Sequence, residues 1–438
     1  MWFALAWFAA AAGKPTPGLV ERLVAVPYDP TGMYEVGEPV GWRVTAPPGI
    51  HPSRAKFAYT VRRNNAVEIA AGELDLAAGP GVIEATLDEP AMVYVEIRAA
   101  AASPVGNGDA AGTSAAAEEQ VLALGAAVAP TKLQPVAPPP EDFDEFWREQ
   151  VAALERVPPN PRLTPKPTDV PGIDYATLEM DHVDGGRVHA QTAKPSREGK
   201  FPGLVILQWA GPPYRLYPSW VAPHAAKGWL VLNIEPHDVL PDQPAEYYAA
   251  LPEDLKRYEA IGRESREACY FRKMYLADYR AVEYVASHPQ WDGRTLVVMG
   301  NSMGGQQTLC VAGLHPRATH LIAYVPAGCD LNGCLHGRQN GYPFFPCDEA
   351  AAMNTARYFD AVNFAPRIRA KALVGMGFVD AVCPPTGIWT AYNAIPGEKE
   401  VVALVDAAHN HQATPEQQRP YVERAAAWLD ALVEGREP

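Results

Sequence analysis

Six uniformly apolar runs beyond residue 200 constrain the fold of this chain more than any other feature. Segments long enough for helices separate them. The runs are 203–208, 229–234, 295–300, 320–325, 371–377 and 400–405. Strands that are apolar on both sides are buried on both faces, which is typical of parallel sheets flanked by helices. The sequence therefore predicts an α/β domain whose mostly parallel sheet is covered by helices on both faces.

Residues 19–130 follow a different pattern, with short runs in which apolar and polar residues alternate. Such alternation indicates strands with one buried face, and turn-prone segments separate the runs. The runs are 41–48, 56–63, 82–87, 91–99 and 119–128. We therefore expect an antiparallel β-sandwich domain over 19–130, a proline-rich linker over 131–140 and the α/β domain over 141–438.

Two further elements are expected at the start of the α/β domain. The segment 141–157 has apolar residues at helical spacing, which predicts an amphipathic helix. The runs 175–183 and 187–193 flank the turn-prone residues 184–186, which predicts a hairpin.

The net charge and the first residues bear on partners and location. The chain has 438 residues and a formal net charge of −14 at pH 7, so its surface repels phosphate backbones and nucleic acid is not expected as a partner. Residues 1–13, MWFALAWFAAAAG, join an apolar run to small residues, as a signal peptide does, and are too short to span a bilayer. We therefore expect a secreted or periplasmic protein, with 1–13 as a signal-peptide remnant and no membrane span.

The six cysteines do not have the spacing of a metal site. None lies in a C-x-x-C pair and no histidine cluster accompanies them, so no metal is expected. Cys329 and Cys334 are candidates for a disulfide in an oxidising compartment, and buried free thiols are the alternative.

The segment 300–304, GNSMG, stands between an apolar strand and a run that favours a helix, and a further glycine follows at 305. Serine at a sharp strand-to-helix turn projects its hydroxyl, and the tight turn favours glycine at neighbouring positions. This context is that of the nucleophile of an α/β-hydrolase fold. The sequence therefore predicts Ser302 as a nucleophile.

A serine nucleophile needs a base, and the base needs an orienting carboxylate. In this fold the chain order is Ser, acid, His, with each residue at the carboxyl end of a strand. Asp380 follows the run 371–377 and His409 follows the run 400–405, so we expect them to be the acid and the base. Two alternatives stay open, because chain order does not fix geometry: His411 as the base and Asp330 as the acid.

The oxyanion of such an enzyme is bound by the backbone N–H after the nucleophile and by a second N–H from the loop after an early strand. These positions are Met303 and, as the second donor, Ala210, with Gly211 as the next choice. Aromatic side chains offer substrate contacts near the site, although core packing is the alternative for each. They are Trp209, Tyr214, Tyr270 and Trp389.

Over residues 138–430 the chain resembles the acetyl xylan esterase and cephalosporin-C deacetylase family, carbohydrate esterase family seven. The shared segments are PEDFDEFWREQ, PQWDGRTLVVMGNSMGG, GFVDAVCPPTGIWTAYNAI and KEVVALVDAAH. The resemblance implies that Ser302, Asp380 and His409 form the catalytic triad of an enzyme that hydrolyses short acyl esters, chiefly acetyl, on xylan-derived sugars. It implies no metal or organic cofactor. The family commonly forms hexameric rings, so a homo-oligomer is a further expectation.

The chain departs from the family pattern in several places, which indicates a divergent member. The glutamine after the nucleophile is replaced by Met303, and the HGY segment reads QWA at 208–210. The RGQ segment is replaced by EPHD at 235–238, and Asn410 stands where a glutamate follows the catalytic histidine. Core members of the family lack a β-rich N-terminal domain.

Two other functions fit parts of the pattern. A serine peptidase of the prolyl oligopeptidase type also places a β-domain before its hydrolase domain, although about 110 residues are too few for a seven-bladed propeller. A carbohydrate-binding protein with an inert hydrolase domain is the non-enzymatic alternative. The set of Ser302, Asp380 and His409 argues against the inert alternative, and the short β-domain argues against the peptidase.

Overall fold

The computed structural model describes residues 20–49, 56–99, 121–208 and 215–438. The described residues divide into two compact units. The N-terminal unit comprises 20–133 with 337–339, and the larger unit comprises 134–336 with 340–438. Each unit has its own hydrophobic core. The expected signal-peptide remnant at 1–13 lies outside the described residues.

The described strands of the N-terminal unit form two sheets. Their orders are β1-β3-β6 and β2-β8-β7-β4-β5, and all pairs are antiparallel except the short pair β2–β8. The strands are β1 (Val24–Pro27), β2 (Met33–Tyr34), β3 (Pro39–Thr45), β4 (Lys56–Arg63), β5 (Val67–Asp75), β6 (Gly81–Thr86), β7 (Ala91–Ala99) and β8 (Val121–Val128). Side chains from both sheets, such as Trp42 and Phe57, share one core, which confirms the predicted β-sandwich.

The sequence pattern does not predict β5, and its environment explains why. This strand lies at the end of its sheet, and most of its side chains are exposed, including those of Val67 and Ile69. A strand with little buried surface has little need of alternating apolar residues. The expected signal is therefore absent there.

The larger unit contains one sheet, which has nine strands within the described residues, in the order β17-β16-β15-β14-β12-β13-β11-β10-β9. Strands β12 to β17 run parallel to one another, and β11, β10 and β9 are antiparallel at one edge. The strands are β9 (Arg162–Pro165), β10 (Ile173–Asp181), β11 (Arg187–Pro195), β12 (Phe201–Leu207), β13 (Leu230–Glu235), β14 (Trp291–Asn301), β15 (His320–Tyr324), β16 (Lys371–Gly377) and β17 (Lys399–Leu404). The six predicted apolar runs coincide with β12 to β17, and the predicted hairpin is β10–β11.

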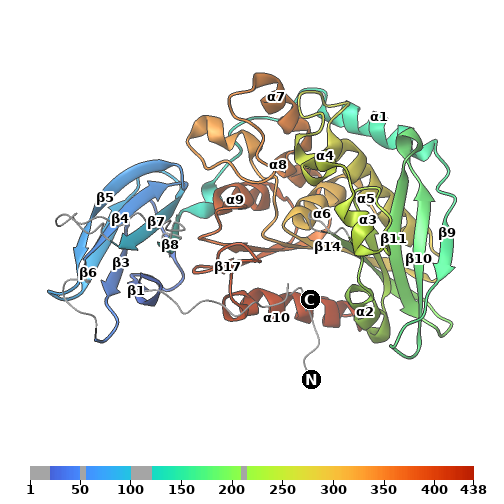
Figure 1. Ribbon diagram of the computed structural model, residues 1–438, viewed down its shortest axis with the longest axis horizontal. Helices are drawn as coiled ribbons and strands as arrows, with labels where there is room; N and C mark the ends of the chain where they lie inside the picture. Colours follow the sequence, from blue (N-terminus) through green and yellow to red (C-terminus); the bar gives the residue numbers. More distant parts are fainter. Residues whose placement is uncertain (1–19, 50–55, 100–120, 209–214) are drawn as a thin grey trace, which may run out of the picture. The chain divides into compact units, whose positions relative to one another are not determined.

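Helices cover both faces of this sheet (Figure 1). On one face lie α2 and α10, and on the other lie α5, α6, α8 and α9. The helices are α1 (Phe143–Glu155), α2 (Ala222–Lys227), α3 (Ala245–Ala249), α4 (Glu253–Lys256), α5 (Tyr270–Ser287), α6 (Met303–Leu314), α7 (Ala350–Phe359), α8 (Ala361–Phe364), α9 (Pro385–Ala394) and α10 (Pro415–Val433). Among the described helices, none is long and apolar enough to cross a membrane.

The two helical layers explain the uniform apolarity of the parallel strands. Leu204 and Ile206 of β12 pack in one cluster with Trp428 of α10, whereas the alternate residues Val205 and Leu207 are equally buried on the other face. A strand covered on both sides has no position for a polar side chain without a partner. The predicted α/β-hydrolase arrangement is therefore confirmed.

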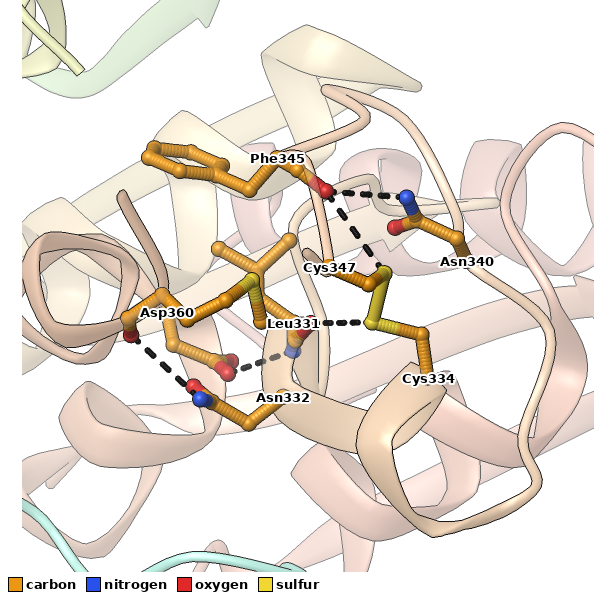
Figure 2. Close-up of a disulfide and its surroundings, with 8 residues drawn as sticks. Leu331, Asn332, Cys334, Asn340, Phe345, Cys347 and Asp360 are labelled. Atoms are coloured by element: carbon orange, nitrogen blue, oxygen red, sulfur yellow. Dashed lines mark hydrogen bonds between the residues drawn. A yellow bond between two sulfur atoms is a disulfide. The ribbon is translucent and has the colours of Figure 1, made fainter. Parts of the chain in front are cut away.

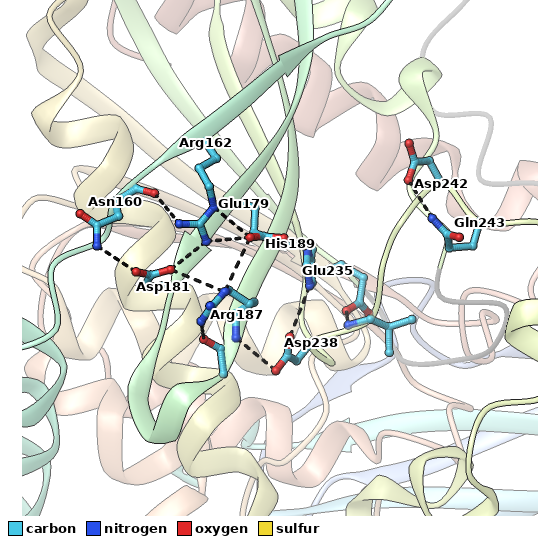
Figure 3. A network of polar contacts seen from close by, with 12 residues as sticks. Asn160, Arg162, Glu179, Asp181, Arg187, His189, Glu235, Asp238, Asp242 and Gln243 are labelled. Carbon is cyan, nitrogen blue, oxygen red and sulfur yellow. Dashed lines mark hydrogen bonds and ion pairs between the residues drawn. The ribbon is translucent and has the colours of Figure 1, made fainter.

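Strand β9, at the edge of the sheet, is stabilised by ion pairs rather than by apolar packing. The Arg162 guanidinium donates to the carboxylates of Glu179, at 2.9 Å, and Asp181, at 2.7 Å, both on β10. Figure 3 shows this network continuing through Arg187 of β11. Because all four residues of β9 are exposed, its sequence carries no apolar signal and the strand is not predicted.

One disulfide closes the segment that follows η7 (Leu331–His336), and it joins Cys334 to Cys347 (Figure 2). Cys329 was the candidate partner of Cys334, and this pairing is wrong, because Cys329 is a free cysteine, as the alternative held. Only four residues lie between Cys329 and Cys334, but the chain turns through η7 and brings Cys347 to Cys334 instead. The other 3-10 helices within the described residues are η1 (Val20–Arg22), η3 (Pro130–Lys132), η4 (Val183–Gly185), η5 (Pro218–Trp220), η6 (Tyr258–Ala260) and η8 (Ala365–Arg367).

Breaking this disulfide is expected to lower the free energy of unfolding by about 3 kcal/mol, because the bond removes the freedom of the 13-residue loop in the unfolded chain. The double variant Cys334→Ser, Cys347→Ser measures the loss in urea unfolding, and Cys329→Ser is the matched control that keeps the bond. Thiol titration of the unfolded, oxidised protein is expected to count four free thiols. Six thiols, or equal stability of the double variant and the control, would contradict the pairing.

Candidate active site

Ser302 lies at the sharp turn between β14 and α6. Its backbone has φ of 55° and ψ of −118°, a conformation that is strained for any residue with a Cβ atom. Its N–H donates to the carbonyl of Tyr324 at 2.9 Å, and its carbonyl accepts from the N–H groups of Gln306 and Ala327 at 3.0 Å each. These bonds hold the strained residue in place, and its hydroxyl projects from the end of the sheet.

The glycines around Ser302 permit a close approach of three segments. A Cβ atom on Gly300 would lie 2.4 Å from the carbonyl group of Gly304, and one on Gly304 would lie 2.3 Å from the carbonyl oxygen of Leu207 on β12. A Cβ atom on Gly305 would lie 2.9 Å from the Cα atom of Pro326. The G-x-S-x-G-G pattern is therefore required by packing of α6 against its neighbouring strands as well as by the turn.

The structure brings Ser302, His409 and Asp380 together. The Nε2 atom of His409 lies 2.9 Å from the Ser302 hydroxyl oxygen, and its Nδ1 atom lies 2.7 Å from an Asp380 carboxylate oxygen. His409 and Asp380 are only 2% and 1% exposed. Because the carboxylate accepts the Nδ1–H, the lone pair of Nε2 faces the serine hydroxyl, which is the arrangement that a general base needs.

Backbone donors fix the acid. Asp380 follows β16, and its second carboxylate oxygen accepts from the N–H groups of Val382 and Cys383 at 2.8 Å each. These donors hold one oxygen, so the other is directed at the imidazole of His409, which follows β17. The carboxylate therefore both orients His409 and is itself oriented by its own loop.

The two alternatives for the base and the acid, His411 and Asp330, make other contacts. The His411 ring is exposed and packs edge-on against the His409 ring, with 5.1 Å between their centroids, while His409 holds the contact with the serine hydroxyl. Asp330 accepts a hydrogen bond from the N–H of Val136 at 3.2 Å. The geometry thus favours His409 and Asp380 over His411 and Asp330.

The Cys383 thiol, which sequence reasoning missed, lies beside the triad. Burial and the Asp380 carboxylate raise the pKa of this thiol well above its usual range, although a hydrogen bond with the Ser302 hydroxyl acts in the opposite direction. The thiol therefore stays protonated and is a weak nucleophile. Only its place in the sequence, three residues after Asp380, signals this contact.

The first turn of α6 presents the Met303 N–H, one of the helix N–H groups that has no carbonyl partner within its own helix. The other predicted donor positions, Ala210 and Gly211, lie outside the described residues. Gln307, also missed from sequence, donates to the carbonyl of Gln208 at 2.8 Å, so it ties α6 to the end of β12.

Of the four aromatic candidates, Trp209 and Tyr214 lie outside the described residues. Trp389 on α9 is 1% exposed and packs edge-on against Tyr392, so its expected contact with substrate is wrong and core packing is its role. The helical turn that begins at Pro385 directs this side chain into the core. Tyr270 is half-buried at the start of α5, and its hydroxyl lies 3.1 Å from Nδ1 of His237.

Among the described residues, no group of three or more His, Cys, Asp or Glu side chains has a geometry that could hold a metal ion.

Comparison with known proteins identifies the family. The family model for acetyl xylan esterase matches residues 131–429. The acetyl esterase Axe7A of Xylanibacter ruminicola is 27% identical over 426 residues, which is 94% of this chain and 92% of that protein. An acetyl xylan esterase from a Paenibacillus species has 25% identity and a TM-score of 0.58 over 68% of this chain and 98% of its own. A second, from a Thermoanaerobacterium species, has 24% identity and a TM-score of 0.57 over 69% and 97%.

The relatives differ in how much of this chain they match. Both solved structures cover about two thirds of the chain, whereas the alignment with the Xylanibacter ruminicola enzyme is too long to stop at residue 131 and includes most of the N-terminal unit. The sequence match to that relative therefore extends over most of the segment that forms the β-sandwich in this chain. The family model covers well over half of the chain: this protein is a carboxylic ester hydrolase that belongs to the acetyl xylan esterase family.

Proposed function

We propose that this enzyme removes acetyl groups from acetylated xylan and xylo-oligosaccharides, with Ser302 as the nucleophile, His409 as the base and Asp380 as the orienting acid. The observation that carries the proposal is the unbroken chain of hydrogen bonds from the Ser302 hydroxyl through His409 to Asp380. Family membership supports acetylated sugars as the substrate class.

Acylation follows from this geometry. The Ser302 oxygen attacks the acetyl carbonyl carbon while Nε2 of His409 takes the hydroxyl proton, and Asp380 stabilises the imidazolium. The carbonyl oxygen becomes an oxyanion, and the Met303 N–H at the start of α6 donates a hydrogen bond to it. Such a donor lowers the activation free energy by about 3 kcal/mol. The imidazolium then protonates the sugar oxygen as its bond to the acetyl group breaks.

Deacylation uses the same groups in reverse. His409 removes a proton from a water molecule, which attacks the acetyl-Ser302 ester. The second tetrahedral intermediate collapses, the Ser302 oxygen regains its proton from the imidazolium, and acetate leaves.

Acetate release from acetylated xylo-oligosaccharides tests this function. The wild-type protein is expected to release acetate and to hydrolyse p-nitrophenyl acetate, with little action on a peptide p-nitroanilide. Preference for the peptide would favour the peptidase alternative, which the N-terminal unit does not support, since its described strands form a two-sheet sandwich rather than propeller blades. No turnover of any ester would favour the inert, carbohydrate-binding alternative.

The proposed location is outside the cytoplasm. The apolar run at 1–13 supports export, and the Cys334–Cys347 disulfide supports an oxidising compartment, because such bonds are rare where thiols are kept reduced. N-terminal sequencing of the protein purified from its own cells tests this. We expect the apolar run to be removed, and an intact N-terminus in a cytoplasmic fraction would contradict the proposal.

A further inference from the structure

Four side chains from separate segments form two hydrogen-bonded pairs in the larger unit, and ring contacts join the two pairs. Nδ1 of His237 and the Tyr270 hydroxyl are 3.1 Å apart, and the rings of His237 and Tyr258 lie 4.5 Å apart edge to face. The hydroxyls of Tyr258 and Tyr342 form a short hydrogen bond. We call these four residues, His237, Tyr258, Tyr270 and Tyr342, the tyrosine wall.

The backbone of Tyr342 attaches the tyrosine wall to the loops that carry the triad. Its carbonyl accepts from the N–H of Gly328 at 2.9 Å, one residue after Ala327, whose own N–H donates to the Ser302 carbonyl. Its N–H donates to the carbonyl of Val382 at 2.8 Å, and Val382 in turn donates to the Asp380 carboxylate. Tyr342 therefore lies between the nucleophile's loop and the acid's loop.

The other end of the tyrosine wall begins at the carboxyl end of β13. There the Glu235 carboxyl group accepts from the N–H groups of His237 and Val239, at 2.8 Å and 2.9 Å, and fixes the turn that carries the imidazole. In the sheet, only β12 lies between β13 and β14, the strand that leads to Ser302. Both ends of the wall thus lie near the carboxyl ends of the parallel strands, where Ser302, Asp380 and His409 meet.

The wall has a buried layer and an accessible layer. His237 and Tyr258 are 4% and 2% exposed, whereas Tyr270 and Tyr342 are half-buried. Each accessible phenol has its hydroxyl in contact with one of the two buried side chains. The buried layer therefore fixes the direction of two phenols that an incoming molecule can touch.

The tyrosine wall is polar without being charged. Burial lowers the pKa of His237 to about 3, and it raises the pKa of Tyr258 well above the usual range, so both side chains are neutral near pH 7. Burial likewise raises the pKa of Glu235 to about 8, so that carboxyl group is mostly protonated. A phenol offers an apolar ring face and a hydroxyl, the two features with which a neutral pyranose pairs its C–H and O–H groups.

We propose that Tyr270 and Tyr342 bind the sugar that carries the acetyl group, and that Tyr258 and His237 are positioning residues that hold those two phenols. The proposal rests on the proposed function, since it assigns the specificity of that same site. Its consequence is that the wall selects sugar esters over simple alkyl esters without taking part in the chemistry at Ser302.

Tyr→Phe variants separate the two layers. Tyr342→Phe removes the accessible hydroxyl, and Tyr258→Phe removes its buried partner while leaving the substrate-facing side chain in place. For acetylated xylotriose we expect kcat/KM to fall about fivefold to tenfold in either variant, mainly through KM, which is the effect of one neutral hydrogen bond. For ethyl acetate, which has neither a ring nor a hydroxyl, kcat/KM is expected to stay within about twofold.

A double variant tests whether the two hydroxyls act through one hydrogen bond, and a distant Tyr→Phe variant tests whether the effect is local. Tyr258→Phe combined with Tyr342→Phe is expected to lose no more than one single variant does, because both share one hydrogen bond. Tyr175→Phe is the matched control, because Tyr175 lies on β10, which three strands separate from β14 in the sheet. Its hydroxyl donates to Gln191 on β11 at 3.0 Å, and we expect kcat/KM for both substrates to be unchanged. If Tyr342→Phe does not fold, Tyr270→Phe gives the same comparison from the other end of the wall.

Equal losses on both esters would overturn the proposal, because a purely structural role lowers both. Unchanged kcat/KM values for both esters would overturn it as well. Failure of the proposed function is a separate result: Ser302→Ala would then still hydrolyse acetylated xylotriose, whatever the wall variants do.

Discussion

Replacing Ser302 by alanine is expected to lower kcat for acetyl ester hydrolysis by about 10⁴-fold to 10⁶-fold while leaving the fold unchanged. Alanine has no oxygen to form the acyl-enzyme, so only the oxyanion donors and substrate binding remain. It keeps the Cβ atom of serine, so the strain of a positive φ is the same, and the backbone bonds to Tyr324, Gln306 and Ala327 are retained.

Acetate release from acetylated xylotriose measures this loss, with thermal unfolding as the check on folding. Ser287→Ala, at the exposed end of α5, is the matched control and is expected to keep full activity. A Ser302→Ala variant that retains more than about one hundredth of the wild-type kcat would remove the serine from the mechanism.

Asp380→Asn is expected to lower kcat by about 10⁴-fold with little change in KM. One carboxylate oxygen of Asp380 accepts from two backbone N–H groups, so an asparagine would place its carbonyl there and turn its NH₂ toward His409. The imidazole would then have to accept at Nδ1 and carry its proton on Nε2, facing Ser302. A histidine in that tautomer has no lone pair for the serine proton.

The neighbouring Asp406→Asn is a suitable control, because Asp406 is exposed and lies three residues before His409 on the same loop. It removes a similar charge close to the site and is expected to leave kcat within about twofold. Comparable losses in both variants would mean that net charge, rather than the tautomer of His409, controls the rate.

Much of the fold can be predicted from the sequence, because burial on both faces imposes continuous apolarity on β12 to β16. The strands that are not predicted are β1, β2, β5 and β9. Each lies at the end of its sheet, and β5 and β9 are largely exposed. There a strand is stabilised by backbone pairing and, in β9, by the charges of Arg162, neither of which leaves a periodic signal.

The site is predictable only where the chain order is informative. The order Ser, Asp, His selects residues at the ends of β14, β16 and β17, but it cannot separate His409 from His411, since a loop decides which ring meets the serine. The tyrosine wall has no local pattern, because its members come from four separate segments. The single sequence signal is the unusual EPHD segment at 235–238, which supplies His237.

The reactivity of Ser302 is the claim on which the rest depends, and covalent labelling with a fluorophosphonate measures it most directly. Intact-mass analysis followed by peptide mapping is expected to find one phosphonyl group per chain, on Ser302, with no label in Ser302→Ala and labelling slowed by a large factor in Asp380→Asn. A folded wild-type protein that takes up no label, or that carries it on another residue, would contradict the account.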